Sequence, residues 1–544
     1  MFNLPTASQS FEVIRQKGYL YVDKTNYIYK IAQEPGYFLL TRPPKFGKTL
    51  LQDTLEALFS GDRELFKGLK IDYSDYDFEK YPVVRLNIPA KILSWGALEK
   101  SIRKQLKASA EKNGLSLKIN AIDEGFTQLV TDLAAKTGRR IVVLIDDYDM
   151  PLLSDFDEPD ITEKNMEIAN NLYLTLLRAI KRDFIRTLFI TGQITPTAEC
   201  GSSFSNHLRN LTLDIAYHGI CGFTPTEFTN YFSLYLPGML EYQKTMGLVK
   251  ADTTVSGLKK MIFDFYDGYS WDGKHRILNP YSIVQCLAKK KIKPYWYKKF
   301  TPNFLMARFL YDPMEFFDVE AIKIARDVIL WQDSFRERDI STVLFQTGHL
   351  TFDRLCSSPN GKIEFETRFP NREIIERLNI DYLRMLLILE APNIRSAAKM
   401  LEESLLKFNG ALLAKNISGI LSFLDAREYH EYKKICSFVF SILFRSMNYR
   451  VLNGALISES PREMVIYSAN GPVFIVEFAV QATNSKKENL TNTEIKTVLD
   501  ETLQQAKINL SRSSIRELIP ENTYKVFEVA VAIVNDTYVK ADIY

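Results

Sequence analysis

The chain has 544 residues, of which 46% are hydrophobic, so its size and composition allow about two to four domains with full-sized cores. A formal net charge of +3 gives no global electrostatic reason to expect binding to nucleic acid or to a membrane surface. The 5 cysteines and 5 histidines are scattered without metal-ligand spacing, which argues against a disulfide framework and a protein-held zinc site. The first residues lack the pattern of a signal peptide, and no apolar run reaches the ~18 residues of a membrane span. We therefore expect a soluble, cytoplasmic protein.

In chain order, the first predicted elements are a short strand at 19–22, a helix at 23–32 and an apolar strand at 37–41. A second helix is expected at 50–59, and the turn that precedes it is segment 42–49, Arg-Pro-Pro-Lys-Phe-Gly-Lys-Thr. A strand, a tight turn that ends in Gly-Lys-Thr and a helix form the layout of a phosphate-binding loop. The sequence therefore predicts that this turn binds the phosphates of a nucleotide.

The residue types in this turn suit that chemistry. Backbone N–H groups at a helix N-terminus attract anionic phosphates. Lys48 is expected to reach the β- and γ-phosphates, and the Thr49 hydroxyl to ligate Mg²⁺. The general motif has glycine at the position of Arg42, so the match is incomplete. The residues of the turn that we predict to bind the nucleotide are Lys45, Phe46, Gly47, Lys48 and Thr49.

Two adjacent carboxylates follow a second apolar run. Ile141–Ile145 consists of branched aliphatic residues, which is typical of a strand that is buried on both faces. Asp146 is expected at the carboxyl end of this strand, where α/β sheets place their ligands, as a carboxylate that holds Mg²⁺. Asp147 is the candidate for the group that orients or deprotonates an attacking water. The alternative is a strand that ends at a solvated acidic turn.

Further strands are predicted on either side of this run. A strand at 83–88 lies between the two motifs in sequence, which favours the P-loop ATPases that have an added strand there. A helix at 165–182 precedes a strand at 187–192. Thr191 near the end of that strand lies where a residue could sense the γ-phosphate, although an ordinary transition from strand to loop explains it equally well.

Taken together, the motifs resemble those of the bacterial AAA-ATPase-like proteins that are joined to a PD-(D/E)XK nuclease domain. The family usually has arginine where Arg42 stands, and Asp-Glu-Tyr-Asp where this chain has Asp-Asp-Tyr-Asp at 146–149. The segments that carry the resemblance are Tyr21–Thr25, Arg42–Thr49, Leu65–Leu69, Ile145–Asp149, Thr191–Gly192, Cys221–Thr224, Tyr266–Tyr269 and Asn279–Ser282.

This resemblance implies ATP as the ligand and DNA as a candidate partner, and Mg²⁺ is expected with the ATP. A weaker alternative is an ATPase of the signalling type, whose partner is another protein. The resemblance also implies that Asp147 replaces the glutamate that the family uses as a base. The aspartate is shorter by one methylene, and a positioning error of ~1 Å can cost on the order of 100-fold in rate. ATP binding is therefore more strongly indicated than ATP hydrolysis.

The middle of the chain has weaker signals. Segment 289–300 mixes lysines with aromatic residues, a composition that can bind single-stranded nucleic acid or can form a solvated face over packed aromatic rings. Strands are predicted at 343–345 and 350–352, and helices over 381–414. We interpret 291–425 as a helical linking or lid region.

The last part of the chain has the element order of a restriction-endonuclease-like domain. Its predicted elements are a helix at 430–447, strands at 449–456, 464–468 and 473–478, a helix at 493–510 and a strand at 526–534. Nucleases of this kind hold Mg²⁺ with carboxylates and use the lysine of Glu-x-Lys to orient or activate a water. The resemblance implies Glu463 and Glu477 as the catalytic carboxylates, but the position of the lysine is Ala479. Lys486, Lys487 and Lys507 are candidates to replace it, and the simpler interpretation is a nuclease-like fold that has lost cleavage.

The sequence therefore predicts an α/β protein in three parts. Residues 1–290 form a P-loop NTPase domain with a parallel sheet flanked by helices, 291–425 a helical extension, and 426–544 a degenerate restriction-endonuclease-like α/β domain. The predicted function is ATP binding and hydrolysis, coupled to a nuclease-like module that is a candidate for binding DNA. The alternative is a non-catalytic interaction scaffold that retains both folds.

Overall fold

The chain divides into two compact units, which are described separately. Unit 1 comprises Met1–Met306 and Ile322–Asn371, and unit 2 comprises Ala307–Ala321 and Arg372–Tyr544. The predicted division into three parts at 290 and 425 stays a prediction. The computed structural model describes residues 2–5, 9–89, 92, 94–153, 159–197, 202–297, 305, 319, 322–330, 339–357, 361–387, 391–424, 432–447, 449–453, 463–467, 471–481, 491–512, 516, 519, 525–535 and 537–544.

Unit 1 is built on a five-stranded parallel sheet with the strand order β2-β3-β4-β1-β5. Although β4 follows β3 in the chain, it lies between β3 and β1 in the sheet. The carboxyl ends of β1, β3 and β4 therefore share one edge, and the strands predicted at 37–41, 83–88, 141–145 and 187–192 are confirmed. The strands are β1 (Gly36–Thr41), β2 (Val83–Asn87), β3 (Ile141–Asp146), β4 (Ile185–Gly192) and β5 (Arg209–Asn210).

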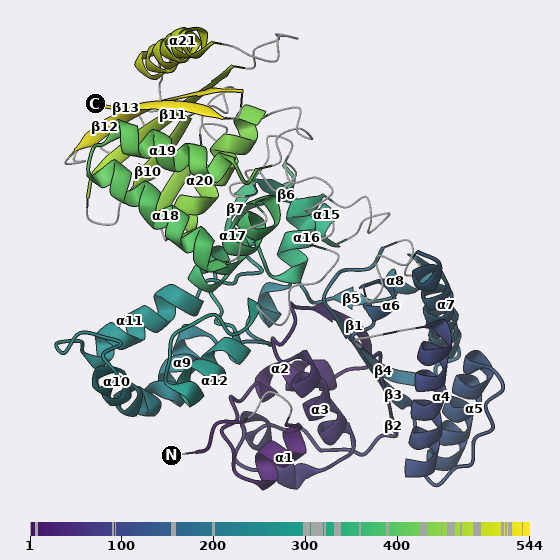
Figure 1. Cartoon of the computed structure of the whole chain (residues 1–544). Helices are drawn as coiled ribbons and strands as arrows, with labels where there is room; N and C mark the ends of the chain where they lie inside the picture. Colours follow the sequence, from purple (N-terminus) through teal and green to yellow (C-terminus); the bar gives the residue numbers. More distant parts are fainter. Residues whose placement is uncertain are drawn as a thin grey trace. The chain divides into compact units, whose positions relative to one another are not determined.

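Both faces of this sheet are covered by helices (Figure 1). Every residue of β3 is buried, and alternate residues of β3 point to opposite faces. Val143 and Ile145 belong to the core that includes α4, α5 and α7, whereas α3 contacts β3 from outside that core. These helices are α3 (Lys48–Phe59), α4 (Trp95–Lys112), α5 (Ile122–Thr137) and α7 (Pro159–Lys181).

The rest of unit 1 consists of short helices and one small sheet. A second apolar core is formed mainly by α9 (Pro225–Phe232), α10 (Leu236–Thr245), α11 (Val255–Tyr266) and α12 (Pro280–Lys289). The other helices are α1 (Phe11–Gln16), α2 (Thr25–Ala32), α6 (Met150–Leu153), α8 (Ser202–Ser205), α15 (Arg326–Leu330) and α16 (Ile340–Thr347), with 3-10 turns η1 (Arg63–Phe66), η2 (Lys70–Tyr73), η4 (Ile215–Tyr217) and η5 (Ser233–Tyr235). The small antiparallel sheet has the order β6-β8-β7, with β6 (Lys323–Ala325), β7 (Thr351–Ser357) and β8 (Ile363–Arg368).

Two of the local predictions for unit 1 are wrong. Segment 343–345 is not a strand but lies within α16, all of whose residues are buried. Full burial removes the alternation of polar and apolar residues that distinguishes the two element types, so the apolar run was ambiguous. Segment 19–22 is not a strand either, and it contributes only one isolated bridge, between Tyr19 and Asn3.

Unit 2 contains a mixed five-stranded sheet with the order β13-β12-β11-β10-β9. β11 and β12 pair parallel, and the other neighbours pair antiparallel. The predicted order of helix, three strands, helix and strand is present from α20 to β12, and β13 is an additional edge strand that the sequence analysis missed. The strands are β9 (Arg450–Asn453), β10 (Glu463–Tyr467), β11 (Val473–Gln481), β12 (Val526–Val534) and β13 (Tyr538–Ile543).

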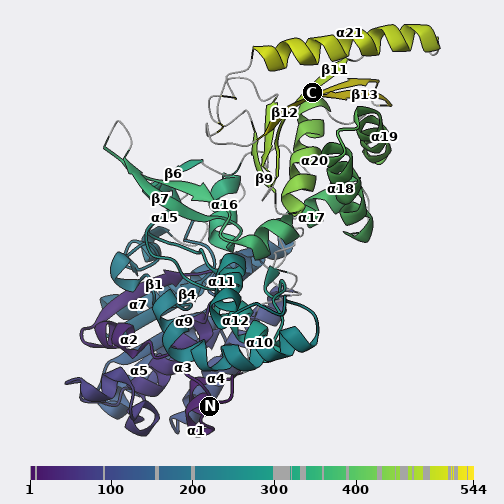
Figure 2. The same cartoon turned by 90° about the vertical axis from the view of Figure 1, so that its left-hand side faces the viewer.

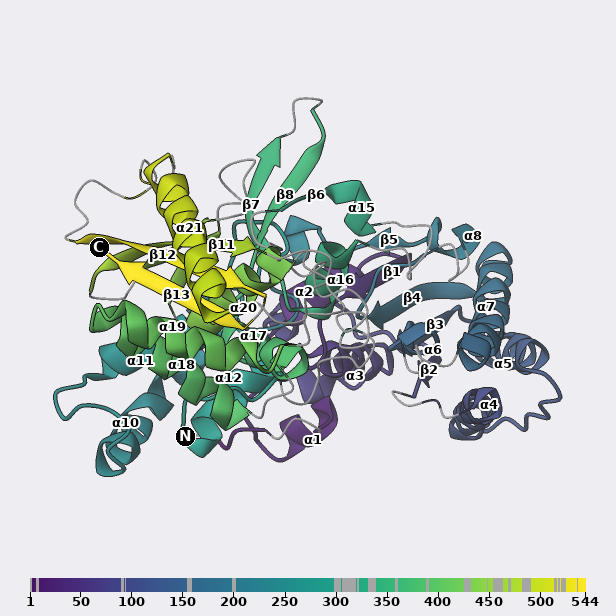
Figure 3. The same cartoon turned by 45° about the horizontal axis from the view of Figure 1, so that its top comes forward.

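Helices cover both faces of this sheet (Figure 2). Val473, Ile475 and Ala479 of β11 share a core with α21, which lies across the strands in Figure 3. Val476 and Phe478, on the opposite face of the same strand, meet apolar side chains of α18, α19 and α20. The helices are α17 (Arg372–Leu387), α18 (Ala391–Leu406), α19 (Gly410–Leu421), α20 (Tyr432–Ser446) and α21 (Asn492–Ser511). Among the helices that the structure describes, none has the length and apolarity needed to cross a bilayer.

Candidate functional site

The turn between β1 and α3 has the backbone of an open anion-binding loop. Two of its residues have a positive φ, 61° at Lys45 and 100° at Gly47. An L side chain is strained at the latter angle, so the glycine is required for the chain to enter α3 in this direction. Gly47 is the N-cap of α3 and provides no side chain to cap it, so the first N–H groups of the helix have no side-chain cap. This end of the helix therefore attracts anions.

Lys48 is a buried ammonium group that is held by its own loop. Its Nζ donates to the backbone oxygens of Arg42 at 2.9 Å and Pro43 at 3.2 Å, and the residue is only 5% exposed. Within the described part of the chain, no carboxylate forms a hydrogen bond with this amine. A buried cation requires a compensating charge. The position of Lys48 therefore favours an anionic ligand at the loop.

A chain of hydrogen bonds joins Asp146 to the neighbouring elements. The hydroxyl of Thr191 on β4 donates to Oδ1 of Asp146 at 2.5 Å. Nε2 of Gln52 on α3 donates to that hydroxyl and to the backbone oxygen of Ile145, both at 2.7 Å. Because Asp146 is only 3% exposed, these hydrogen bonds hold a buried carboxylate in place beside the start of α3. The hydroxyl of Thr191 is thus bonded to Asp146, while its role as a sensor of the γ-phosphate stays a prediction. Gln52 belongs to the same hydrogen-bond network and was not predicted from the sequence.

Asp147 follows directly, in an unusual conformation. Its φ is 54°, and its backbone N–H donates to Oδ1 of Asp146 at 3.1 Å. A residue other than glycine in the left-handed region is uncommon and is often found at functional sites. Burial raises the pKa of the Asp147 carboxyl, and the positive charge of Lys48 opposes that shift. A carboxylate with a raised pKa beside a cation is suited to accept a proton.

Asp149 is the second site residue that the sequence analysis missed, although it belongs to the Asp-Asp-Tyr-Asp motif. Its Oδ2 accepts the N–H groups of Gln193 at 2.6 Å and Ile194 at 2.7 Å, directly after β4. Burial raises the pKa of Asp149 from 3.8 to about 6. The hydroxyl of Tyr148 also donates to the oxygen of Ile194. These bonds fix the loop after β4 against the turn that carries Asp147.

Arg42, the departure from the general motif, is an anchor for the loop. It is 1% exposed, and its Nη1 donates to the oxygens of Thr41 and Thr212. Its guanidinium lies 4.0 Å from the ring centroid of Trp271, a cation–π contact. Burial lowers the pKa of Arg42 to about 10. The arginine thus packs inside unit 1.

Aromatic residues far along the chain support the loop from behind. Phe46 is fully buried, and its ring meets those of Tyr269 and Trp271 edge-on, at 4.8 and 5.4 Å. Its backbone is therefore the part that can meet a phosphate. Nε1 of Trp296 donates to the oxygen of Pro44 at 2.7 Å. Tyr295, Trp296 and Tyr297 are buried, so segment 289–297 packs its aromatic rings inside, as one of the two interpretations of 289–300 expected. Residues 298–300 lie outside the described residues.

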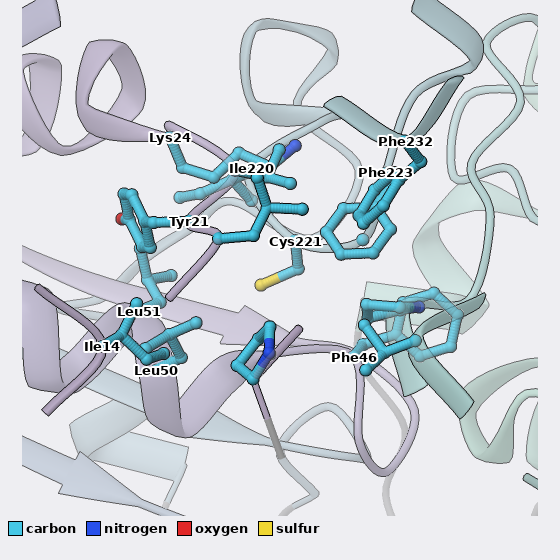
Figure 4. A pocket seen from close by; sticks show the side chains of 17 residues that line it. Ile14, Tyr21, Lys24, Phe46, Leu50, Leu51, Ile220, Cys221, Phe223 and Phe232 are labelled. Atoms are coloured by element: carbon cyan, nitrogen blue, oxygen red, sulfur yellow. The ribbon is translucent and has the colours of Figure 1, made fainter. Parts of the chain in front are cut away.

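An apolar pocket of about 630 Å³, including its open mouth, lies beside the start of α3. It is lined by Gly47 and Leu50 of the loop and helix, by Tyr21 near the N-terminus, and by Cys221 and Phe223. In Figure 4 the sulfur of Cys221 points toward the middle of this space. Apolar walls with few polar groups are typical of small-molecule sites. The loop and the pocket together provide neighbouring charged and apolar surfaces.

The candidate site of unit 2 differs. Glu463 and Glu477 pair in register across β10 and β11, and the side chain of Glu463 lies outside the described residues. Glu477 is fully buried, and its Oε1 accepts a hydrogen bond from Nδ2 of Asn509 on α21 at 2.8 Å. Ala479 lies in the core beneath α21.

The lysine that a nuclease needs is not brought to Glu477 by the candidates that the structure describes. Lys507 forms an ion pair with Asp542 at 2.6 Å. Lys486 and Lys487 fall outside the described residues. Of the three candidate lysines, the one that the structure describes thus pairs with a different carboxylate.

Comparison with known proteins is informative mainly for unit 1. Residues 5–200 match the family model described as "Predicted AAA-ATPase". The chain is 29% identical over 384 residues to an uncharacterized protein encoded in the vnfD 5' region of Azotobacter chroococcum mcd 1, an alignment that covers 69% of each chain.

Two solved structures show only a distant likeness. One is the Aeropyrum pernix ORC1 protein in complex with DNA, with a TM-score of 0.26 and 11% identity, covering 65% of this chain and 92% of that chain. The other is a signal-transduction ATPase with a tetratricopeptide-repeat sensor from Pyrococcus horikoshii, with a TM-score of 0.23 and 12% identity, covering 79% and 57% of the respective chains. At these scores neither likeness carries an argument about this chain.

Proposed function

We propose that unit 1 binds ATP with Mg²⁺ in the loop between β1 and α3. The observation that carries this proposal is the buried amine of Lys48, which is bonded only to loop carbonyls among the described residues. The uncapped start of α3 and the carboxylate of Asp146 belong to the same sheet edge. An ammonium, free helical N–H groups and a carboxylate are the three parts that a magnesium-bound triphosphate needs.

The roles of the individual groups follow from these positions. Lys48 exchanges its two carbonyl partners for the β- and γ-phosphates, and the N–H groups at Gly47 and Lys48 bind the same anion. Thr49 on the exposed side of α3 and Asp146 hold Mg²⁺, and Thr191 keeps the carboxylate of Asp146 oriented. Asp146 fits this role because, among the described residues, its Oδ2 forms no hydrogen bond. A magnesium ion held by these residues would neutralise the charge that builds up between the phosphates.

The apolar pocket beside α3 is the proposed site of the adenine base. Phe46 and Gly47 line both the loop and the pocket, so a nucleotide can reach both surfaces at once. Tyr21 and Phe223 offer aromatic faces to a base, and Cys221 lies between them (Figure 4). Lys24 at the pocket rim is neutralised by Glu227 at 2.6 Å, which leaves the pocket without a strong net charge.

Hydrolysis is proposed with Asp147 as the base. Burial raises the pKa of its carboxyl, and Lys48 provides a compensating charge. The shorter side chain compared with glutamate predicts a slow enzyme rather than an inactive one. Asp149 takes no part in the proton transfer and instead holds the loop at Gln193 and Ile194.

For unit 2 we propose a nuclease-like fold that does not cleave. The five-stranded mixed sheet between helix layers and the in-register pair Glu463 and Glu477 support the fold. The buried Ala479 at the lysine position supports the loss of cleavage. DNA is the partner that the sequence resemblance implies, and a binding scaffold without catalysis is the alternative that Ala479 favours.

Calorimetric titration of the full chain with ATP in magnesium buffer tests the proposal. The wild type takes up one equivalent, and Lys48→Ala lowers the affinity by about 100-fold because the ammonium is lost from a buried phosphate site. Lys104→Ala, on an exposed position of α4, is the matched control and leaves binding unchanged. Equal binding by the wild type and Lys48→Ala would overturn the assignment.

Incubation with plasmid and Mg²⁺ or Mn²⁺ tests unit 2, and cleavage that Glu477→Ala abolishes would contradict the proposed inactivity.

A further inference from the structure

A histidine cluster lies near the phosphate loop, outside the site described above. His218 follows the short turn η4, whereas Asp272 and His275 belong to a tight turn before α12. One ligand-type atom from each of these three side chains lies within 4.8 Å of the others. The two imidazole rings stack, with 4.2 Å between their centroids and 23° between their planes. Two segments that are far apart in sequence therefore bring together a carboxylate and two imidazoles.

The hydrogen bonds of the cluster orient these groups for a ligand. Nδ1 of His218 lies 2.9 Å from the oxygen of Ile215, so Nδ1 carries the proton and Nε2 keeps its lone pair. Oδ1 of Asp272 accepts the N–H groups of Lys274 at 2.9 Å and His275 at 2.8 Å. Oδ2 of Asp272 lies 2.6 Å from Nδ1 of His275. Oδ1 thus holds the carboxylate of Asp272 in place. Oδ2 shares a proton with the imidazole of His275, and a cation can take the place of that proton.

The turn that carries two of these groups is rigid. Gly273 has a φ of 71°, and a Cβ there would lie 2.8 Å from the carbonyl carbon of Arg354. A side chain at this position would be strained and would collide with a backbone, so only glycine fits. The hydroxyl of Ser270 adds a further hydrogen bond to Asp272, at 3.2 Å. The backbone therefore fixes where Asp272 and His275 stand.

We propose that His218, Asp272 and His275 form a binding site for a first-row transition-metal dication, and that Zn²⁺ is the ion that it binds. Two imidazole nitrogens and one carboxylate oxygen are a common set of three protein ligands for zinc, with water in the fourth position. His218 and His275 are partly exposed, which leaves room for that water, and the side chain of Asp272 is 8% exposed. Mg²⁺ and Ca²⁺ prefer sites made only of oxygen atoms, so the donor set selects against them. The backbone acceptor on Nδ1 of His218 is typical of histidines at metal sites.

The site also has a structural consequence for the phosphate loop. Trp271 precedes Asp272 directly, and its ring lies over the guanidinium of Arg42. Arg42 also donates to the oxygen of Thr212, on the segment that leads to His218. A metal bound by the cluster thus joins the two segments that hold Arg42. We expect Zn²⁺ to raise the melting temperature of the protein by several degrees, since a ligand that binds only the folded state stabilises it.

Zinc titration of the full chain without a polyhistidine tag tests this proposal. The protein is first treated with a chelator and then titrated with ZnCl₂ in millimolar Mg²⁺, which occupies sites made of carboxylates alone. We expect one equivalent of Zn²⁺, and a Co²⁺ derivative with the visible absorption of a four-coordinate nitrogen and oxygen site. His218→Gln and His275→Gln each lower the affinity at least 10-fold, in the range typical of altered metal sites. His207→Gln, an exposed histidine outside the cluster, is the matched control and binds as the wild type does.

Circular dichroism melts without metal show whether each variant is folded. Failure of the wild type to bind Zn²⁺, or retention of full affinity when both cluster histidines are replaced, would overturn the proposal. If one glutamine variant does not fold, the other variant and His275→Asn give the same comparison. Because ATP binding is measured separately, loss of the zinc site and failure of the proposed nucleotide site give distinguishable results.

Discussion

Both units place acidic residues on the strands of an α/β sheet, but the surroundings of these residues differ. In unit 1, Asp146 is the last residue of β3 and Asp147 follows it, at the edge where α3 begins, next to the buried amine of Lys48. In unit 2, Glu477 lies within β11, fully buried beneath α21, with an alanine two residues later. A carboxylate on a strand is thus not a site by itself. It also needs a nearby cation and an opening to ligand.

The largest expected effect would come from an attempt to make unit 2 resemble an active nuclease. Ala479→Lys places an ammonium at a position that is 6% exposed, between the sheet and α21. We expect a loss of about 4 kcal/mol in the free energy of unfolding of unit 2, because a buried charge without a partner is costly. Urea denaturation followed by circular dichroism measures this loss. A stable variant that cleaves plasmid DNA would show that the active site of unit 2 lacks only the lysine.

Removal of the support behind the phosphate loop is expected to have the next largest effect. Trp296→Ala deletes a fully buried indole and its hydrogen bond to Pro44. A loss of about 3 kcal/mol in the stability of unit 1 is expected from the cavity, together with weaker ATP binding. Trp296→Phe retains most of the volume and loses the hydrogen bond, so it separates the two contributions. Unchanged ATP affinity in both variants would mean that the loop does not depend on this contact.

Asp147→Asn separates hydrolysis from binding. The amide retains the shape of the side chain but cannot accept a proton, so phosphate release from ATP should fall by about 100-fold. The affinity for ATP should change little. A matched comparison is Asp147→Glu, which introduces the glutamate usual in the AAA-ATPase-like proteins that the motifs resemble and should retain or raise the rate. Equal rates for the wild type and Asp147→Asn would remove this residue from the mechanism.

The smallest expected effect concerns the response of unit 1 to pH. Burial raises the pKa of Asp149 from 3.8 to about 6, so the folded state holds a proton that the unfolded state releases between those values. The free energy of unfolding should therefore decrease, by on the order of 2 kcal/mol, as pH rises through this window. Since other carboxylates titrate in the same range, the wild type is compared with Asp149→Asn at each pH. A stability difference that stays constant between about pH 4 and about pH 7 would contradict the raised pKa.

The sheet of unit 1 could be predicted because its strands are buried and rich in branched aliphatic residues, as in Ile141–Ile145. By contrast, β13 was missed because it is an edge strand in which Ala541 is the one buried residue among Tyr538–Ile543. The sequence predicts a strand at 343–345, which lies within the helix Ile340–Thr347, because the full burial of this helix hides the helical period.

The motif residues Lys48, Asp146 and Thr191 could be placed from local pattern, since each stands at the end or start of a regular element. Gln52 and Asp149 required the fold, because their partners lie on other strands. The same holds for Trp296, which reaches the loop from a distant segment. Local spacing cannot reveal such contacts.

In the proposed function, the amine of Lys48 leaves its two loop carbonyls to bind a triphosphate beside Asp146. A crystal structure with Mg²⁺ and a non-hydrolysable ATP analogue measures this most directly. We expect phosphate oxygens at ~3 Å from Nζ of Lys48, with the ion between Thr49 and Asp146. Nucleotide bound elsewhere, with Lys48 still bonded to Arg42 and Pro43, would contradict it.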